Sequence, residues 1–265
     1  MILPRCSHIL LIVCFAVSIS GCDNSLEPID EETGIFAIYG FLDLNKQNHY
    51  IRVRDLNVPF TREATETIDA TVTLHNLTLG TSTLLESEHR AHQDVYQHNF
   101  LVSGTIQPNA EYNLTVKRSD GVSVEVQAVM PTKPEPVITP SNPNCFTPVE
   151  VELNPLQGGV LVYTIGVNLG SPSPRFTAER IIRTSGDQPG KISFTFTLAE
   201  VVDEVRFFNT PACEELNLDH YMINYRHFGP GFYEKLENDP FDILQSTERF
   251  GGYYRVSLVL PMNNQ

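Results

Sequence analysis

The stretch that decides the fold is Tyr112–Ala128, which reads YNLTVKRSDGVSVEVQA. Tyr112, Leu114 and Val116 alternate with polar residues, and a second alternating segment follows Gly121. Alternation of this kind is typical of a strand with one face buried. An Asp-Gly pair between two such strands indicates a hairpin, because glycine readily adopts the positive φ of a tight turn. The stretch therefore predicts two antiparallel strands joined at that glycine.

The same two-residue period recurs along most of the chain and predicts further strands. We expect them at Ile35–Tyr39, His49–Arg54, Ala70–Leu74, Val149–Leu153, Val160–Val167, Ile192–Leu198, Val205–Phe208 and Tyr253–Leu260. Because strands outnumber helices, we predict an all-β fold of two β-sandwich-like domains, immunoglobulin-like or transthyretin-like in form.

One segment departs from the period of two. Leu218, Tyr221, Met222 and Tyr225 recur at helical spacing, and Gly229 follows as a stop signal. We therefore expect one short helical excursion near the C-terminus, a helical insertion over 217–237.

Prolines mark the boundary between the two domains. Six of them fall between Pro131 and Pro148. Proline cannot donate to a strand ladder, so this density predicts a connector or a sheet edge. At 265 residues the chain is long enough for two domains of ordinary size. We place the N-terminal sandwich at 34–131, the Pro-rich connector at 132–148 and the C-terminal β domain at 149–265.

The N-terminus predicts export followed by lipid anchoring. Arg5 precedes Ile9–Ile19, an apolar run too short to cross about 30 Å of hydrocarbon as a helix. A cationic lead with a short apolar core is typical of a signal peptide. The next residues, Ile19-Ser20-Gly21-Cys22, resemble the bacterial lipobox, whose cysteine is acylated and becomes the first residue. We expect a signal peptide at 1–21 and fatty acyl chains such as palmitate on Cys22. The alternative is an ordinary secretory signal with an incidental cysteine.

The charge balance excludes one class of partner. The formal net charge is −14, and an acidic surface repels phosphate backbones, so we expect no nucleic-acid binding. Acidic residues are dense over 22–33, which we interpret as a solvated tether between the lipid and the first strand. Many surface-exported lipoproteins of Bacteroidetes-like bacteria carry similar acidic residues. We expect attachment to the outer membrane of the cell envelope, on either the periplasmic face or the surface face of that membrane.

Several segments, taken in order, resemble one family of uncharacterised bacterial lipoproteins, domain of unknown function 4249. The similar segments are the lipobox, Tyr39-Gly40-Phe41-Leu42, Phe100–Val116 with Gly104, Pro108 and Tyr112, Asp120-Gly121, Met130-Pro131, the tyrosines of 217–237, Asn238-Asp239-Pro240-Phe241 and Phe250-Gly251-Gly252-Tyr253. The resemblance implies an envelope lipoprotein, often found with TonB-dependent outer-membrane receptors, without demonstrated enzyme activity. It offers no catalytic residues to carry over. This chain is also short for the family, so ligand-binding loops of other members could be missing from it.

Two cysteines remain beside Cys22 once residues 1–21 are removed, and they are Cys145 and Cys213. In an oxidising envelope such a couple favours a disulfide. The alternative is two separate buried thiols.

The histidine-rich stretch Glu88–His98 invites a metal interpretation, because imidazole and carboxylate groups bind zinc. In an extended segment His92, Asp94 and His98 would project from one side. However, Arg90 lies among them and no metalloprotease signature is present, so a solvated loop explains the stretch better.

An aromatic cluster surrounds Gly229-Pro230-Gly231. Aromatic side chains on a rigid turn suit a partner-docking surface. The alternative is that they cap the open end of the second β domain. The cluster contains Tyr221, Tyr225, Phe228, Phe232 and Tyr233.

No motif in the sequence indicates catalysis or a cofactor. The Gly-x-Ser-x-Gly elbow and the Asp-x-Asp-x-Asp-Gly calcium loop are both absent. We therefore expect a non-enzymatic binding or accessory lipoprotein, with a TonB-dependent receptor as a possible partner. The alternative is a surface module that binds a glycan, a peptide or a metal, or mediates adhesion. A hydrolase with an unusual site is a third hypothesis.

Overall fold

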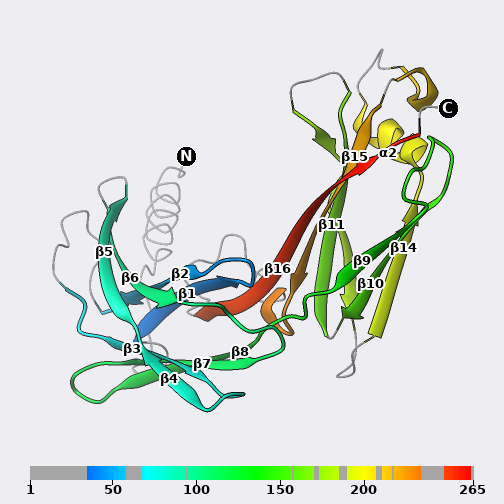
Figure 1. Cartoon of the computed structure of the whole chain (residues 1–265). Coiled ribbons are helices and arrows are strands. Elements are labelled where there is room, and N and C mark those ends of the chain that lie inside the picture. Colours follow the sequence, from blue (N-terminus) through cyan, green and yellow to red (C-terminus); the bar gives the residue numbers. More distant parts are fainter. Residues whose placement is uncertain are drawn as a thin grey trace, which may run out of the picture. The chain divides into compact units, whose positions relative to one another are not determined.

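Three β-sheets form the core of the chain, as the alternating pattern predicts (Figure 1). The computed structural model describes residues 35–57, 67–92, 95–156, 158–169, 173–184, 190–206, 211–216, 218–233 and 248–263. All of these belong to one compact unit, Ile35–Gln265. Within it the strands assemble two β-sandwich lobes, so the prediction of an all-β sandwich fold is confirmed.

The first lobe buries the alternating residues that the sequence assigns to its strands. A sheet of order β4-β3-β7-β8 packs against the part of a larger sheet formed by β1, β2, β6 and β5. Leu114 and Val116 of β7 meet Ile38, Leu42 and Ile51 of the opposite sheet in one apolar core. The strands are β1 (Phe36–Asp43), β2 (Asn48–Asp55), β3 (Thr71–Asn76), β4 (Thr81–Leu84), β5 (Glu86–His92), β6 (Val95–Ser103), β7 (Glu111–Lys117) and β8 (Ser123–Val129).

The second lobe repeats this arrangement with a three-stranded sheet of order β14-β10-β9. It faces β11, β15 and β16, and the residues between the two sheets form a separate apolar core. The elements are β9 (Glu135–Thr139), β10 (Val149–Leu156), β11 (Gly159–Val167), β12 (Arg175–Phe176), β13 (Arg180–Thr184), β14 (Gly190–Phe196), the helix α2 (Leu198–Val205), the short 3₁₀ helix η1 (Cys213–Glu215), β15 (His220–Phe228) and β16 (Glu248–Pro261).

The last strand, β16, belongs to both lobes. Its first half, Glu248–Tyr253, pairs in parallel with Ile38–Asp43 of β1. Its second half, Tyr253–Pro261, pairs antiparallel with β15. The strand, red in Figure 1, therefore joins the two groups of strands into one nine-stranded sheet. The two sandwiches thus share β16 and belong to one unit.

The proline-rich segment is held by both lobes. Its residues 135–139 form the edge strand β9, where Pro136 pairs opposite Leu153. Just before it, Lys133 Nζ donates to Leu44 O of the first lobe at 2.8 Å. Tyr225 of β15 donates its hydroxyl to Pro134 O at 3.2 Å. These contacts fasten the connector to the sheet on either side of β16.

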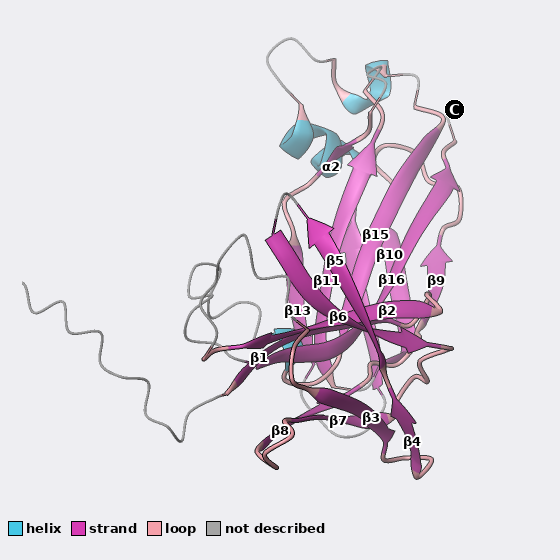
Figure 2. Cartoon of the chain, turned by 90° about the vertical axis from the view of Figure 1, so that its left-hand side faces the viewer, coloured by secondary structure: helices cyan, strands magenta, loops and turns pink. Residues whose placement is uncertain are grey.

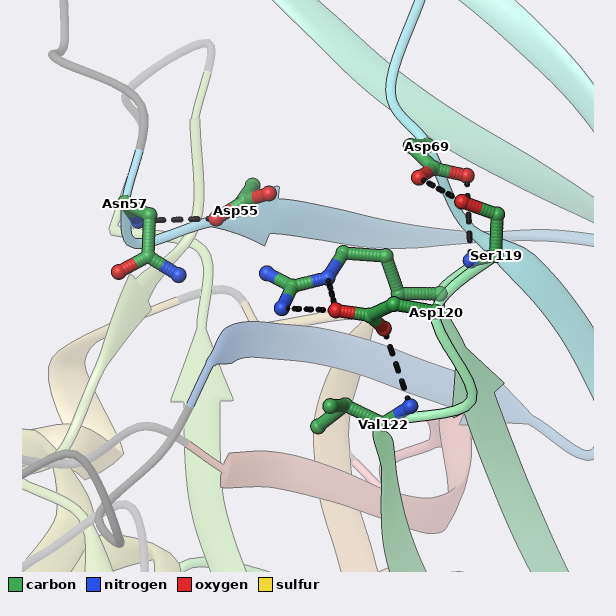
Figure 3. A network of polar contacts seen from close by, with 7 residues as sticks. Asp55, Asn57, Asp69, Ser119, Asp120 and Val122 are labelled. Atoms are coloured by element: carbon green, nitrogen blue, oxygen red, sulfur yellow. Dashed lines mark hydrogen bonds and ion pairs between the residues drawn. The ribbon is translucent and has the colours of Figure 1, made fainter.

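The β7–β8 turn has the predicted Asp-Gly geometry (Figure 3). Gly121 has φ +95°, and its N–H donates to Arg118 O at 3.0 Å. Asp120 Oδ1 accepts from Val122 N at 3.1 Å, while its Oδ2 accepts from the Arg118 guanidinium. The Arg118 side chain and this backbone bond hold the pKa of the Asp120 carboxyl below its usual range. Ser119 donates to the carboxylate of Asp69, which ties the turn to the segment before β3.

The predicted helix at 217–237 is wrong over its central part, which forms the strand β15. The segment contains a second period that the helical interpretation overlooked, since Tyr221, Ile223 and Tyr225 alternate on the face toward the second core. Pairing with β11 on one side and β16 on the other satisfies the β15 backbone along its length, which a surface helix would not require.

The helix lies earlier in the chain, at α2, in a region predicted to contain strands. Thr197 and Glu200 form a reciprocal capping box at its start. Leu198, Val201 and Val202 are its buried residues. Val205 therefore ends a helix instead of beginning the predicted strand Val205–Phe208, whose last two residues are not described. The helices of the described ranges are all too short or too polar to cross a bilayer.

Candidate functional site

The two faces of the β11–β15–β16 segment have different chemistry. Tyr163 and Tyr225 point into the second core. The alternate residues of the same strands lie on the opposite face, which we call the outer face. Two rows of cross-strand neighbours follow one another on it, Val162–Arg226–Arg255 and Thr164–Asn224–Ser257.

These two rows border a depression of about 450 Å³, which we call the arginine depression. Its volume lies in the range of small-molecule binding sites. The residues that line it are Asn45, Val162, Tyr163, Thr164, Glu179, Asn224, Tyr225, Arg226, Arg255, Val256 and Ser257.

Arg226 and Arg255 are direct cross-strand neighbours in this depression. Like charges in such positions repel each other. Among the described residues, each arginine has one carboxylate partner. Arg226 forms an ion pair with Glu179, and Arg255 Nε lies 3.3 Å from Asp43 Oδ2. The charged groups therefore follow one another across the sheet in the order Glu179, Arg226, Arg255 and Asp43, with the two guanidinium groups between the two carboxylates.

The Asp43 carboxylate is only 2% exposed, whereas the Arg255 side chain is 56% exposed. Asp43 Oδ1 accepts from Asn45 N at 3.0 Å. Its Oδ2 makes no hydrogen bond within the described residues, so the Arg255 charge is its main compensation. Asp43 therefore holds one side of the Arg255 guanidinium and leaves the other nitrogens at the surface.

The amide side chains of the depression are oriented by hydrogen bonds. Ser257 Oγ donates to Asn224 Oδ1 at 2.6 Å, so the amide nitrogen of Asn224 remains as a donor. Asn45 Nδ2 donates to Arg255 O at 2.6 Å, which leaves Asn45 Oδ1 as an acceptor. Together with the two guanidinium groups, these contacts make the depression richer in donors than in acceptors.

The predicted aromatic docking surface is wrong for four of its five residues. Tyr221, Tyr225, Phe228 and Phe232 are each at most 5% exposed, because they fill the apolar clusters of the second lobe. Tyr233 is partly buried beside them.

Phe228 and Phe232 form a small apolar cluster on the outer face with Tyr253. The Phe232 ring lies over Gly251, where a Cβ atom would come within 2.2 Å of it. The same ring contacts Phe41, with centroids 5.6 Å apart. The Gly229-Pro230-Gly231 turn thus folds aromatic residues back onto the sheet, where they pack against it instead of facing a partner.

A disulfide joins Cys145 and Cys213, with Cα atoms 5.9 Å apart. Ala199 N of α2 also donates to Cys145 O at 2.9 Å. The bridge therefore fastens the end of the connector region to η1 and α2 at one end of the second lobe.

The predicted metal ligands are only partly described. Asp94 lies outside the described residues, as does the side chain of His92, while His98 lies on β6 opposite Val53 of β2. Among the residues that the structure describes, no group of three or more histidine, cysteine and acidic side chains is arranged to hold a metal ion. Cys22, the signal peptide at 1–21 and the tether at 22–33 also lie outside the described residues.

Sequence reasoning did not find the arginine depression. The pairing of Arg226 with Arg255 depends on the register of two strands separated by residues 229–247. The sequence did contain a signal for Arg226. If Tyr221–Arg226 is taken as a strand, its alternation places Arg226 on the face away from the buried Tyr221 and Tyr225.

Comparison with known proteins does not identify the chain. No family model matches it, and no curated protein does. Among solved structures it is similar to pullulanase from Anoxybacillus sp. LM18-11, with 12% identity and a TM-score of 0.25 over 72% of this chain and 24% of that chain. It is also similar to a Salmonella alpha-2-macroglobulin mutant, with 10% identity and a TM-score of 0.27 over 87% of this chain and 15% of that chain. A third similar structure is that of the chicken CNTN1 FN1–FN3 domains, with 10% identity and a TM-score of 0.25 over 84% of this chain and 62% of that chain. This chain spans about a quarter of the pullulanase, and likenesses at these TM-scores carry no conclusion about function.

Proposed function

We propose that the chain is a lipid-anchored protein of the bacterial cell envelope with a non-enzymatic binding role. The observation that carries the proposal is Ile19-Ser20-Gly21-Cys22 after an apolar run of 11 residues. Two acyl signals are needed for stable attachment, and the diacylglyceryl group of a lipoprotein supplies two chains.

The position of the folded unit supports this anchoring. The unit begins at Ile35, so 12 residues separate it from Cys22. An extended segment of this length reaches about 40 Å. Such a reach would let the β lobes work above the headgroups of the membrane.

The disulfide between Cys145 and Cys213 supports export as an independent observation. Structural disulfides persist in oxidising compartments and are rare in the cytosol of most organisms. A chain that carries both a lipobox and this bridge fits the outer membrane, facing either the periplasm or the outside.

The proposed partner is an outer-membrane receptor of the TonB-dependent type that the family resemblance implies. A second candidate function is a surface module that binds a small ligand directly. The arginine depression favours the second candidate, because its volume and its exposed donors suit a small polar ligand.

Metabolic labelling with a palmitate analogue tests the anchor. The wild-type chain should take up the label, and Cys22→Ala should abolish it. Cys14→Ala is the matched control, because Cys14 lies inside the apolar run and should be removed with it. Equal labelling of the Cys22→Ala variant and the wild-type chain would contradict the proposal.

Cross-linking in intact envelopes followed by affinity purification tests the partner. The receptor hypothesis predicts that one outer-membrane protein is recovered with the tagged chain, in amounts well above those recovered with an unrelated lipoprotein. Recovery at the background level would remove the support for an accessory role and leave the ligand-binding candidate.

A further inference from the structure

We propose that the arginine depression binds a carboxylate-bearing sugar, such as a hexuronate unit of an acidic polysaccharide. The inference rests on the binding role proposed above and specifies its ligand. Four properties of the depression favour such a ligand: its guanidinium groups, its donor balance, the pairing of its strands and its size.

The two neighbouring guanidinium groups of the depression favour an anionic group. Arg226 and Arg255 lie side by side, although the chain as a whole carries a formal net charge of −14. Within the described residues, their ion-pair partners Glu179 and Asp43 balance the two charges and come from outside the two strands. Side chains of the arginines are 44% and 56% exposed, so guanidinium nitrogens remain accessible. A ligand carboxylate between them would relieve the repulsion of the cross-strand pair and accept charge-assisted hydrogen bonds.

The donor balance favours a ligand rich in oxygen atoms. Asn224 lines the same depression as the two arginines, and the bond that its Oδ1 accepts from Ser257 leaves its amide nitrogen as a donor. Asn45 Oδ1 and the Thr164 hydroxyl add acceptors for ligand hydroxyl groups. A sugar acid offers both a carboxylate for the guanidinium groups and hydroxyls for the amides.

The pairing of the strands disfavours an acidic peptide as the occupant. β15 is hydrogen-bonded to β11 on one side and to β16 on the other. A peptide added as an extra strand needs a free sheet edge, and β15, which carries Arg226 and Asn224, offers none. Recognition at Arg226 and Asn224 must therefore use their side chains, which suits a compact polar molecule.

The size of the depression agrees with such a ligand. A volume of about 450 Å³ lies toward the lower end of the range for small-molecule sites. Its position on the open face of a sheet also leaves room for the neighbouring units of a longer saccharide.

Isothermal titration calorimetry on the full chain in detergent tests the proposal, with D-galacturonate and D-glucuronate as probes. At least one of them should bind saturably, with a dissociation constant of about 1 mM or lower. A dissociation constant of about 1 mM corresponds to a binding free energy of about −4 kcal/mol. D-Galactose, which lacks the carboxylate, and inorganic sulfate, which lacks the hydroxyls, should each bind at least about tenfold more weakly.

Three variants locate the binding. Arg226→Gln removes one guanidinium and leaves only the exposed Glu179 unpaired, so the fold should be kept. Asn224→Asp places a negative charge beside the ligand carboxylate. Each should weaken binding about tenfold or more. Arg52→Gln, on an exposed position of β2 in the same large sheet, is the matched control and should leave binding unchanged.

Three results would overturn the proposal. They are no heat of binding with either sugar acid at about 10 mM, binding that is unchanged in Arg226→Gln and Asn224→Asp, or sulfate binding as tight as that of the sugar acids. The last result would indicate a general anion site. Because the assay uses purified protein, each of these failures is separate from a failure of acylation at Cys22.

Discussion

Phe250 of β16 lies directly beside Gly40 of β1 in the parallel part of the large sheet. A Cβ atom at Gly40 would come within 2.9 Å of the Phe250 ring, so the absence of a side chain there makes room for the ring. Phe250 is 1% exposed and belongs to the core of the first lobe, although it lies near the C-terminus. The first lobe is therefore completed by the last strand of the chain.

Replacing Phe250 with alanine should destabilise the protein by about 3–5 kcal/mol, because it opens a cavity in a core shared by strands from both ends of the chain. Phe146→Ala is the control, since that side chain is 63% exposed and its loss should cost about 0.5 kcal/mol or less. Urea unfolding followed by circular dichroism measures both. Equal midpoints for the two variants would contradict a structural role for β16 in the first lobe.

The Cys145–Cys213 disulfide should stabilise the second lobe substantially. It closes a loop with a sequence separation of 68, for which the chain-entropy relation gives about 4 kcal/mol. Urea unfolding of the Cys145→Ser, Cys213→Ser double variant measures the loss. A wild-type midpoint that is unaffected by reductant and equal to that of the double variant would show that the bridge does not constrain the unfolded chain.

His227 should make stability depend on pH below neutrality. Its ring is fully buried, with Nε2 2.9 Å from Gly158 O and Nδ1 3.2 Å from both Thr132 O and Thr132 Oγ1. Burial disfavours the charged form of the ring. Burial lowers the pKa of His227 below its ordinary value of 6.5.

The direction of this pH dependence follows from which state of the chain binds the proton. As the pH falls through about 6.5, the unfolded chain takes up a proton that the folded chain resists, so the free energy of unfolding decreases. The contribution is complete above that pH and is lost progressively below it. Urea midpoints between pH 8 and pH 5 should therefore fall more steeply for the wild-type chain than for His227→Gln. Parallel curves would show that His227 is not held neutral.

Two buried tyrosines of β15 should respond oppositely to removal of their hydroxyl groups. The Tyr221 hydroxyl is buried and makes no hydrogen bond within the described residues, and burial raises the pKa of Tyr221 to about 12. Tyr221→Phe should therefore leave stability unchanged or raise it slightly. Tyr225→Phe should cost about 1 kcal/mol, because it removes the bond to Pro134 O that holds the connector. Thermal unfolding of both variants measures the difference, and a larger loss in Tyr221→Phe would contradict the assignment.

The local sequence pattern was sufficient to predict the strands that bury one face and expose the other. Leu114 and Val116 of β7 alternate with polar residues, and Gly121 takes the expected positive φ, so this hairpin could be predicted in detail. The pattern failed in β15, where Met222 and Phe228 on the outer face interrupt the alternation, so that two periods fit the same residues. It also missed α2, although Thr197 and Glu200 form a capping box that is visible in the sequence.

The candidate site could not be predicted in the same way, because it depends on contacts between distant segments. Arg226 and Arg255 become neighbours only through the register of β15 and β16, and Asp43 reaches Arg255 only because β16 also pairs with β1. Single-segment periodicity contains no information about such pairings. The cysteines were an exception, since Cys145 and Cys213 are the two that remain besides Cys22 after the predicted signal peptide, and they allow one disulfide between them.

The proposed anchoring in the cell envelope depends most directly on the chemical state of Cys22. Mass spectrometry of the N-terminal peptide from chain purified out of native envelopes measures it. We predict that the peptide begins at Cys22 and carries the added mass of a diacylglyceryl group, with or without a third acyl chain. A peptide that begins elsewhere, or that begins at Cys22 with a free thiol, would contradict the account.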